Sequence, residues 1–357
     1  MRVGLVLPCN IWFAPFLKIY TRALDELNIE YDTISWNRDG KENNYGLQFE
    51  FSQEYVTKNR FVKIIPYIKY TSFVKKIVKK NKYDRLIVFT SQNAIFMHRF
   101  LRKHYKGKYI VDYRDHSIEQ KSILKSTFKS VLDNCYATFV SSPGFIKDLP
   151  AGYKYYISHN FNINEVRNAL NNDEIVPFKK EPLNILTIGG IRNFSSNTEV
   201  VKALANKENV KMSFVGKGPA SGPIGQYANE NGIKNTEIIG YYDKEDEPAY
   251  VKECSFMNIY FPRIISHNSI MSNRIYLALI YKKPIIVTSN TTQAEYVEKY
   301  NVGLSIDNCD DLYGKITNFL NNEDEKQFNE RCNKLLQEFM TDYNKFMSIL
   351  GEFVEAK

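Results

Sequence analysis

Ser272, Asn273 and Arg274 belong to the part of the sequence whose residue types could do chemistry most directly. A serine directly before apolar residues at helical spacing can cap a helix, and the exposed amides of a helix start attract phosphate oxygens. An arginine in the first turn adds a bidentate partner that is always charged. The buried-strand pattern 285–288 follows Pro284. The segment suits a diphosphate, and the alternative is an ordinary capped helix with a solvated arginine.

Two further cations follow predicted strands of the same half of the chain. Gly189 and Gly190 let the backbone approach a ligand closely, and Arg192 can reach a diphosphate at the carboxyl ends of the strands. Lys217 stands in the segment 216–218, Gly-Lys-Gly, which predicts a flexible turn. The alternative for Lys217 is a solvated lysine on a tight turn. The full G-x-G-x-x-G order is missing here, so a dinucleotide-binding fingerprint is not indicated.

A polar segment also ends a predicted strand in the first half of the chain, where an open α/β sheet usually places its site. A carboxylate or imidazole at such a place can accept the proton of a substrate hydroxyl within hydrogen-bond reach. Asp115 and His116 are the candidates for this catalytic base. Asp112 and Arg114 are expected to form an ion pair that shapes the loop, with a purely structural pair as the alternative.

Short apolar runs alternate with amphipathic segments from end to end, which is typical of parallel sheets covered by helices. The predicted strands lie at 3–7, 31–36, 85–89, 109–113, 138–140, 155–158, 183–188, 211–215, 236–239, 256–261, 284–288 and 303–306, and examples of predicted helices lie at 13–27, 94–104 and 118–132. Residues 40–54 are polar and predict a long loop with one short strand. The fold class is therefore α/β.

The chain length suits two domains of ordinary size. We expect a Rossmann-like N-terminal domain at 1–163, a linker without hydrophobic periodicity at 164–182, a second Rossmann-like domain at 183–322, and C-terminal helices at 323–357. In the last part Phe328, Leu335, Phe339, Phe346 and Leu350 are expected to pack back across both domains.

The net charge of +8 is concentrated in the first half of the chain. Residues 1–180 hold 29 Lys and Arg against 17 Asp and Glu, a net +12, while residues 181–357 hold 19 against 23, a net −4. Tyr67–Lys82 places lysines around apolar residues at helical spacing. This predicts a basic amphipathic helix that lies on anionic lipid or packs on its own domain with a solvated lysine face. No recognisable nucleic-acid-binding motif accompanies it, so nucleic acid is not an expected partner.

The five cysteines are scattered and form no C-x-x-C pair, which indicates a reduced, cytosolic compartment and no zinc site. No segment approaches the roughly 20 apolar residues of a membrane span. We therefore expect neither a secreted nor an integral membrane protein. The sequence has no D-x-D motif, so no essential metal is expected.

Four segments together resemble the GT-B glycosyltransferases, especially the family 4-like enzymes of bacterial capsular and surface-polysaccharide synthesis. They are 186–192, 214–219, 239–242, and 272–276 with 283–286. The resemblance covers most of the chain. It implies two Rossmann-like domains that face across a cleft, with the acceptor bound by the first domain and the donor by the second. The segment 112–115 also resembles the D-x-R-D segment of some of these enzymes, and 158–160 resembles their H-N segment, which predicts an acceptor contact or a hinge histidine.

The resemblance adds Tyr241 as the residue that lines the nucleotide base. Many relatives carry an E-x7-E pattern whose second glutamate binds the ribose, and here Ile270 and Leu277 occupy those positions. Ribose recognition must then differ, or donor binding is lost. Asn268 and Asn273 are the candidate replacements, since their side chains can hydrogen-bond hydroxyls. The expected donor-binding residues are Gly190, Arg192, Lys217, Tyr241, Asn268, Ser272, Asn273 and Arg274.

These observations predict a metal-independent glycosyltransferase that moves a sugar from a nucleotide-diphosphate sugar to a lipid-linked oligosaccharide. The nucleotide sugar is a co-substrate, and no cofactor is expected. The expected location is the cytoplasm, peripheral on the inner face of the plasma membrane through the helix at Tyr67–Lys82. The alternatives are a nucleotide-sugar epimerase of the same fold and a non-catalytic glycosyltransferase-like subunit. A nicotinamide oxidoreductase is disfavoured, because Leu5–Asn10 lacks glycines after the first strand.

Overall fold

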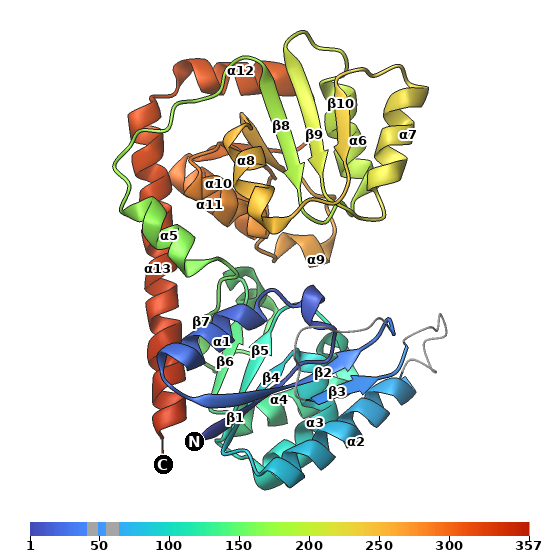
Figure 1. Cartoon of the computed structure of the whole chain (residues 1–357), viewed down its shortest axis with the longest axis vertical. Helices are drawn as coiled ribbons and strands as arrows, with labels where there is room; N and C mark the ends of the chain where they lie inside the picture. Colours follow the sequence, from blue (N-terminus) through green and yellow to red (C-terminus); the bar gives the residue numbers. More distant parts are fainter. Residues whose placement is uncertain (41–48, 55–63, 357) are drawn as a thin grey trace. The chain divides into compact units, whose positions relative to one another are not determined.

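The structure is a computed structural model that describes residues 1–40, 49–54 and 64–356. The chain divides into two compact units, Met1–Asn160 with Thr341–Lys357, and Phe161–Met340. Each unit is a parallel β-sheet with helices packed on it (Figure 1). The predicted α/β class with two Rossmann-like domains is thereby confirmed.

The sheet of the first unit has the strand order β3-β2-β1-β4-β5-β6-β7, with parallel pairing. Its strands are β1 (Arg2–Val6), β2 (Glu30–Asn37), β3 (Phe49–Ser52), β4 (Arg85–Phe89), β5 (Tyr109–Tyr113), β6 (Ala137–Val140) and β7 (Tyr155–Ile157). Parallel strands covered on both faces are continuous apolar runs, and all five residues of β4 are buried. Six strands confirm their predictions to within one residue at each end. Residues 41–48 of the predicted polar loop lie outside the described residues.

The first unit contains both α-helices and short 3-10 helices, labelled η. They are η1 (Ile11–Phe13), α1 (Leu17–Glu26), α2 (Ile64–Asn81), α3 (Ser91–His104), η2 (Ile118–Gln120), α4 (Ser122–Asn134) and η3 (Pro143–Asp148). The helix predicted at 13–27 starts only at Leu17, because Pro15 cannot stand in a helix interior.

Helix α2 contains all but the last residue of the predicted basic helix Tyr67–Lys82. Its apolar side packs on its own unit, where Tyr70, Val74 and Val78 are buried. The hydroxyl of Tyr70 donates to the backbone oxygen of Leu7 at 2.8 Å. The apolar side of the helix therefore packs on its own domain, and a contact of its lysine face with anionic lipid stays a prediction.

The sheet of the second unit has the order β10-β9-β8-β11-β12-β13, again with parallel pairing. Its strands are β8 (Leu183–Ile188), β9 (Val210–Val215), β10 (Thr236–Ile239), β11 (Phe256–Ile259), β12 (Ile285–Thr288) and β13 (Gly303–Ile306). The strand predicted at 256–261 ends two residues early. Its last positions already belong to the polar loop, where Tyr260 donates its backbone N–H to the side chain of Asn258 at 3.0 Å.

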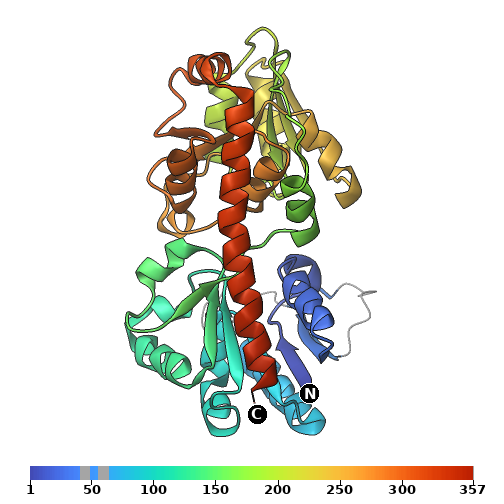
Figure 2. The ribbon, with the colours of Figure 1, turned by 90° about the vertical axis from the view of Figure 1, so that its left-hand side faces the viewer.

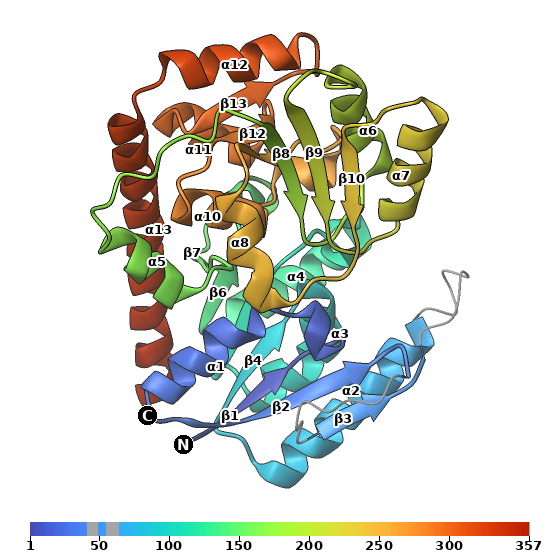
Figure 3. The ribbon, with the colours of Figure 1, turned by 45° about the horizontal axis from the view of Figure 1, so that its top comes forward.

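The helices of the second unit lie on both faces of this sheet, with α6 and α7 on one side and α8 and α10 on the other (Figure 3). Right-handed crossovers that start in opposite directions from β8 require this arrangement. The helices are α5 (Ile163–Leu170), α6 (Phe194–Ala203), α7 (Ser221–Glu230), η4 (Lys244–Asp246), α8 (Glu247–Lys252), α9 (Ile265–Asn268), α10 (Asn273–Ile280), α11 (Thr292–Tyr300) and α12 (Leu312–Asn322).

We predicted the segment 164–182 as a linker without periodicity. The structure instead places most of helix α5 in it. The side chain of Asn162 caps this helix by accepting from the backbone N–H of Asn164 at 3.2 Å. Its apolar residues Ile163 and Val166 are buried. Two residues at i, i+3 spacing are too few to establish a helical periodicity in the sequence.

The C-terminal helix α13 (Glu325–Glu355) is one continuous helix (Figure 2). Its residues up to Met340 belong to the second unit, and those from Thr341 belong to the first. The five apolar residues predicted to pack are all buried: Phe328, Leu335, Phe339, Phe346 and Leu350. In the first unit the ring of Phe346 lies 4.8 Å from that of Phe139, and Arg85 donates to the backbone oxygen of Phe353 at 3.0 Å.

Candidate functional site

The candidate donor site lies at the carboxyl end of the second sheet, between β8 and β11. The strand order reverses there, because the chain runs outward from β8 through β9 on one side and from β11 through β12 on the other. Open α/β sheets bind ligands at such a reversal, in the crevice outside the carboxyl ends of the strands. The loops that reach it are those after β8 and β11, and the second leads into α10.

Arg274 connects both sides of this reversal. Ser272 caps α10 as predicted, with its hydroxyl oxygen 3.4 Å from the backbone nitrogen of Arg274. The guanidinium of Arg274 donates to the backbone oxygens of Ile188 at 2.6 Å, Gly190 at 3.1 Å and Asn258 at 3.4 Å. It is therefore held in place by the ends of β8 and β11.

The charge of Arg274 is poorly compensated. Burial lowers its pKa to about 10; Tyr242 opposes this shift, and the positive charge of Arg192 adds to it. Within the described residues, no carboxylate forms an ion pair with Arg274 or Arg192. Two neighbouring cations without a counter-ion favour an anionic ligand.

The two glycine segments at this edge do different jobs. Gly189 has a φ of +91°, and a Cβ there would meet nothing within 4 Å, so its backbone is open to a ligand. A Cβ on Gly216 would lie 2.1 Å from the backbone oxygen of Gly189, and one on Gly218 would lie 2.1 Å from that of Ile191. The segment 216–218, predicted to be a flexible turn, is instead packed tightly against the loop after β8.

Lys217 stays exposed between these packed glycines. Its ammonium lies 5.6 Å from the ring centre of Tyr241, which is 71% exposed. The backbone N–H of Ile191 donates to the backbone oxygen of Lys217 at 3.3 Å, which joins this pair to the loop of Arg192. The structure thus brings Gly190, Arg192, Lys217, Tyr241, Ser272 and Arg274 to neighbouring loops.

The two asparagines predicted to contact the donor are both exposed. Asn273 is the first residue of α10, beside Arg274, and Asn268 is the last residue of the short helix α9. Leu277, at the position of the missing ribose glutamate, packs against the hydrophobic core of the second unit. Among the described residues, no hydrogen bond joins Asn268 to Arg274.

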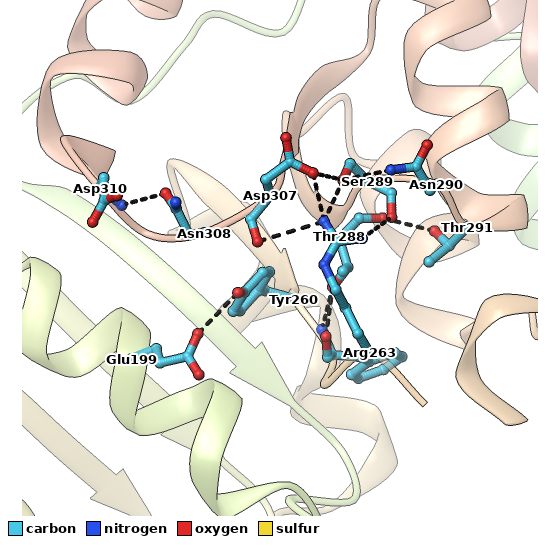
Figure 4. A network of polar contacts seen from close by, with 11 residues as sticks. Glu199, Tyr260, Arg263, Thr288, Ser289, Asn290, Thr291, Asp307, Asn308 and Asp310 are labelled. Atoms are coloured by element: carbon cyan, nitrogen blue, oxygen red, sulfur yellow. Dashed lines mark hydrogen bonds and ion pairs between the residues drawn. The ribbon is translucent and has the colours of Figure 1, made fainter. Parts of the chain in front are cut away.

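Sequence reasoning missed a polar network at the carboxyl ends of β11, β12 and β13 (Figure 4). Arg263, in the loop after β11, donates to Ser289 Oγ at 2.5 Å and pairs with Asp307 at 2.6 Å. The backbone N–H of Phe261 donates to Thr288 Oγ1 at 2.8 Å. These bonds hold the loop that leads into α9 and α10. Ser289 and Asp307 each come directly after a predicted strand, and that position was the available signal.

In the first unit, the carboxyl end of β5 carries the expected ion pair. Arg114 donates to Asp112 Oδ2 through two nitrogens, at 2.7 and 3.0 Å, and both side chains are buried. Burial raises the pKa of Asp112, and the charge of Arg114 opposes that shift. Arg114 also donates to Ser158 Oγ at 2.8 Å, so the pair fixes the loop after β5 to the end of β7.

The two candidate bases differ in their surroundings. Asp115 is exposed, and His116 is half-buried. The Nδ1 atom of His116 lies 3.0 Å from the hydroxyl of Tyr113, and its Nε2 lies 3.2 Å from Asp148 Oδ2. The Tyr113 hydroxyl donates to Glu119 Oε1 at 2.7 Å. No pattern in the sequence marked Glu119 or Asp148 as a neighbour of His116, since Glu119 lies in η2 and Asp148 in η3.

His159 belongs to the structural part of the first unit. Its Nε2 lies 2.9 Å from Asp342 Oδ2, on helix α13, and its side chain is buried. This contact lies within the first unit, and both alternatives for the histidine of 158–160, an acceptor contact and a hinge histidine, stay predictions. In the part of the chain that the structure describes, no group of His, Cys, Asp and Glu could hold a metal, and no helix is long and apolar enough to span a membrane.

No protein-family model matches the sequence, and a search of curated proteins finds no match. Solved structures do match. Sucrose-phosphate synthase from Thermosynechococcus elongatus is similar with a TM-score of 0.69 and 12% identity, over 100% of both chains. The lipopolysaccharide outer core galactosyltransferase WaaB, in its apo form, has a TM-score of 0.67 and 13% identity, over 100% of this chain and 99% of its own. HepE of Anabaena, solved with UDP and glucose, has a TM-score of 0.64 and 12% identity, over 99% and 100%.

These neighbours are GT-B glycosyltransferases, and they match both units, so the chain has the GT-B fold. The UDP-GlcNAc 2-epimerase from Methanocaldococcus jannaschii is similar as well, with a TM-score of 0.54 and 14% identity, over 96% of this chain and 100% of its own. One fold hosts both kinds of enzyme, and function must be argued from the site.

Proposed function

We propose that the protein is a glycosyltransferase that moves a sugar from a nucleotide-diphosphate sugar to a lipid-linked oligosaccharide in surface-polysaccharide synthesis. The observation that carries the proposal is the pair Arg192 and Arg274 at the strand-order reversal, which no described carboxylate neutralises. A diphosphate supplies the missing negative charge. The positive end of the α10 dipole lies beside the pair and favours the same anion, and the open space at Gly189 lets a diphosphate approach the backbone closely.

These cations also serve the chemistry. As the bond between the sugar and the diphosphate breaks, negative charge grows on the leaving oxygen, and fixed positive groups stabilise it most in the transition state. Arg274 is pre-organised for this role by its three bonds to backbone oxygens. Arg192, Lys217 and the start of α10 add charge, so the proposal needs no metal ion.

The nucleoside part of the donor is assigned to the neighbouring loop. The exposed ring of Tyr241 offers a face on which a base can stack, and Lys217 beside it reaches toward phosphate. Asn273 and Asn268 are the proposed contacts to the ribose hydroxyls in place of the absent glutamates.

On the acceptor side, Asp115 or His116 takes the proton of the attacking hydroxyl. Both follow β5, at the carboxyl edge of the first sheet. In a retaining reaction the leaving phosphate can accept that proton instead, and neither side chain is then needed as a base.

We also infer a peripheral contact with the inner face of the plasma membrane through α2. Its lysines at 76, 79 and 80 are exposed, and Ile64, Ile65 and Ile68 at its start are about half exposed. Basic residues near an anionic surface contribute roughly 1 kcal/mol each. Neutralising Lys75, Lys76, Lys79 and Lys80 should release the protein from anionic vesicles. The same change at Lys202, Lys234, Lys252 and Lys326 is the control, and undiminished sedimentation of the first variant contradicts the contact.

The central experiment is a thermal-shift screen of nucleoside diphosphates and their sugars, followed by calorimetry. Arg274→Ala should weaken binding of the preferred nucleotide by about 1.5–3 kcal/mol, the worth of a charged hydrogen bond. Circular dichroism of the variant checks that it is folded. Unchanged UDP and GDP affinity would remove Arg274 from the donor site.

An epimerase is the second candidate, because an epimerase shares the fold and would use the same diphosphate site. It converts a nucleotide sugar with no acceptor present. Proton NMR of UDP-N-acetylglucosamine incubated with the protein alone decides between the two, since a transferase leaves the sugar configuration unchanged. A non-catalytic subunit would fail the nucleotide screen and bind a partner protein only.

A further inference from the structure

A further concentration of positive charge lies in the first unit, in α2, β4 and α3. Residues 64–108 hold 12 Lys and Arg against one acidic residue, Asp84, a net +11. Within the part of the chain that the structure describes, no lysine of this range forms an ion pair with a carboxylate. A surface with so much uncompensated charge of one sign attracts an anionic ligand.

A cavity of about 320 Å³ lies within this basic region, at the amino edge of the first sheet. The elements around it are the last turn of α2, the residues that precede β4, the last turn of α3 and the residue that precedes β5. The apolar part of its lining is buried and consists of Val78, Tyr83, Phe100 and Tyr105. The volume is at the lower end for small-molecule pockets, which suits a small ligand.

The polar part of the lining is mostly basic. Four exposed side chains supply it: Lys79, Lys82, His104 and Lys108. Among the described residues that line the cavity, Asp84 is the one acid, and its Oδ2 accepts the backbone N–H of Arg2 at 2.8 Å. One carboxylate thus stands against three ammonium groups in the lining.

The ends of two helices lower this positive charge without cancelling it. Helix α2 ends at Asn81 and α3 at His104, and a helix end of this kind carries about half a negative charge. With Asp84 the negative charge at the cavity is about −2, against +3 for its three lysines. Lys80 and Lys103 are exposed in the last turns of these helices and add to the surplus. The basic side chains are therefore more than the helix ends require.

Lys82 stands in a backbone conformation that lysine rarely adopts. Its φ is +52°, in the left-handed region that favours glycine and asparagine. Lys282 has a similar φ of +53°, but its ammonium donates to the side chain of Asn333 and to the backbone oxygen of Leu279, which gives it a structural role. The side chain of Lys82 makes no hydrogen bond or ion pair with a described residue. A strained residue whose side chain supports no other part of the fold indicates a use of its charge in binding.

Two of the lysines are placed by hydrogen bonds of their own backbone. Lys108 belongs to the turn between α3 and β5, where its N–H donates to the backbone oxygen of Tyr105 at 2.8 Å and Gly107 has a φ of +69°. The N–H of Lys82 donates to the backbone oxygen of Val78 at 3.0 Å and closes the last turn of α2. Both cations thus stand on backbone that is ordered before a ligand binds, which lowers the entropic cost of binding.

We propose that this cavity binds a phosphate monoester, with Lys79, Lys82 and Lys108 around the phosphate and the buried apolar residues beside the group that carries it. Lysine ammonium groups are compact point charges with three donors each, which suits a phosphate dianion better than a planar carboxylate. A free phosphorylated molecule and a lipid headgroup both present this group. The site goes beyond the proposed function, because it lies at the opposite edge of the sheet from Asp115 and takes no part in sugar transfer.

Calorimetry of the full chain with glycerol 3-phosphate as the probe tests the soluble form of the ligand. The variant Lys82→Gly/Lys108→Ala should weaken binding at least about tenfold, because it removes two charged hydrogen-bond donors. The matched control, Lys18→Ala/Lys154→Ala, removes two exposed lysines of the same unit and should leave the affinity unchanged. Arg192→Ala should also leave it unchanged, which separates this cavity from the candidate donor site. Equal affinities of the variant and the control overturn the proposal.

Vesicles separate the two sources of the phosphate. Phosphatidic acid carries a phosphate monoester, and its vesicles should sediment the native protein but not Lys82→Gly/Lys108→Ala if the ligand is a lipid headgroup. Binding of glycerol 3-phosphate without such sedimentation assigns the site to a free phosphorylated molecule. Either result supports the cavity as a phosphate monoester site. The proposal is overturned if neither probe binds, or if vesicles of phosphatidylglycerol, a phosphate diester, give the same result as phosphatidic acid.

Thermal unfolding followed by circular dichroism tests the strain at Lys82. Lys82→Gly should raise the melting temperature, because glycine adopts the left-handed conformation without steric cost. Lys282→Gly is the matched control and should lower the melting temperature, since it loses the hydrogen bond to Asn333. A lower melting temperature for Lys82→Gly would show that this side chain stabilises the fold, and its conformation would no longer support a binding role.

Discussion

The two sheets of this molecule have the same architecture, but the arginines at their carboxyl edges differ in whether a carboxylate pairs with them. In the second unit, Arg192 and Arg274 stand without a described counter-ion. In the first unit, the charged groups are paired, with Arg114 on Asp112 and His116 beside Asp148. A doubly wound sheet fixes the position of the loops at its carboxyl edge, but it does not determine which charged residues those loops carry. The unpaired arginines of the second unit suit the binding of an anion, whereas the paired groups of the first unit suit the transfer of a proton.

The largest effect is expected where the first edge does chemistry. Loss of the general base should lower kcat by about 10²–10⁴, so Asp115→Asn or His116→Gln should nearly abolish transfer. UDP affinity should not change, because the proposed donor site lies in the second unit. Product formation at saturating donor is the measurement, and His104→Gln, an exposed histidine, is the control. Full activity in both variants would place the proton on the leaving phosphate.

The buried pair beside that base should control the stability of the first unit. Asp112→Ala leaves Arg114 charged and buried without its partner, which costs about 3–5 kcal/mol. Urea unfolding followed by tyrosine fluorescence measures the loss. The exposed pair of Lys211 and Glu237, 2.8 Å apart, is the matched control, and Glu237→Ala should cost about 0–1 kcal/mol. Equal costs would show that pairing at the first edge has no structural role.

A substitution at the carboxyl edge of the second sheet should change the stability of the protein less, and its UDP affinity more, than a substitution at the first edge. Arg192 is exposed and makes no described ion pair, so Arg192→Ala should leave the melting temperature unchanged. UDP affinity should fall by about 1.5–3 kcal/mol, the range for a charged hydrogen bond. Arg99→Ala, an exposed arginine on α3, is the control. If both variants bind UDP equally well, the contrast between the two edges has no part in donor binding.

The smallest effect is expected at the paired cation of the second edge. Asp307→Ala removes an exposed partner of Arg263, which still donates to Ser289. Exposed pairs are worth about 0–1 kcal/mol, so stability and UDP affinity should both change little. A loss of UDP affinity as large as that of Arg192→Ala would mean that this network positions the donor loop.

Most of the fold could be predicted because buried strands leave a strong local signal. All residues of β4 and β12 are buried and most of them are apolar, and each prediction missed at most one residue. Helix α5 was not predicted, because only two residues, Ile163 and Val166, mark its buried side. The two arginines of the candidate donor site could also be predicted from the sequence, since Arg192 follows the end of a strand and Arg274 follows a helix cap. Glu119 was not, because its place beside Tyr113 depends on how η2 folds back on β5.

The continuous helix α13 has a consequence for how the protein is made. Phe346 packs on Phe139 and Arg85 donates to the backbone oxygen of Phe353, so the first unit is completed by residues that are synthesised after the second unit. All of the second unit is synthesised in between. The first unit therefore cannot complete its packing against α13 until the residues from Thr341 onward have been synthesised. Shortening the chain from its C-terminal end would damage the N-terminal unit first.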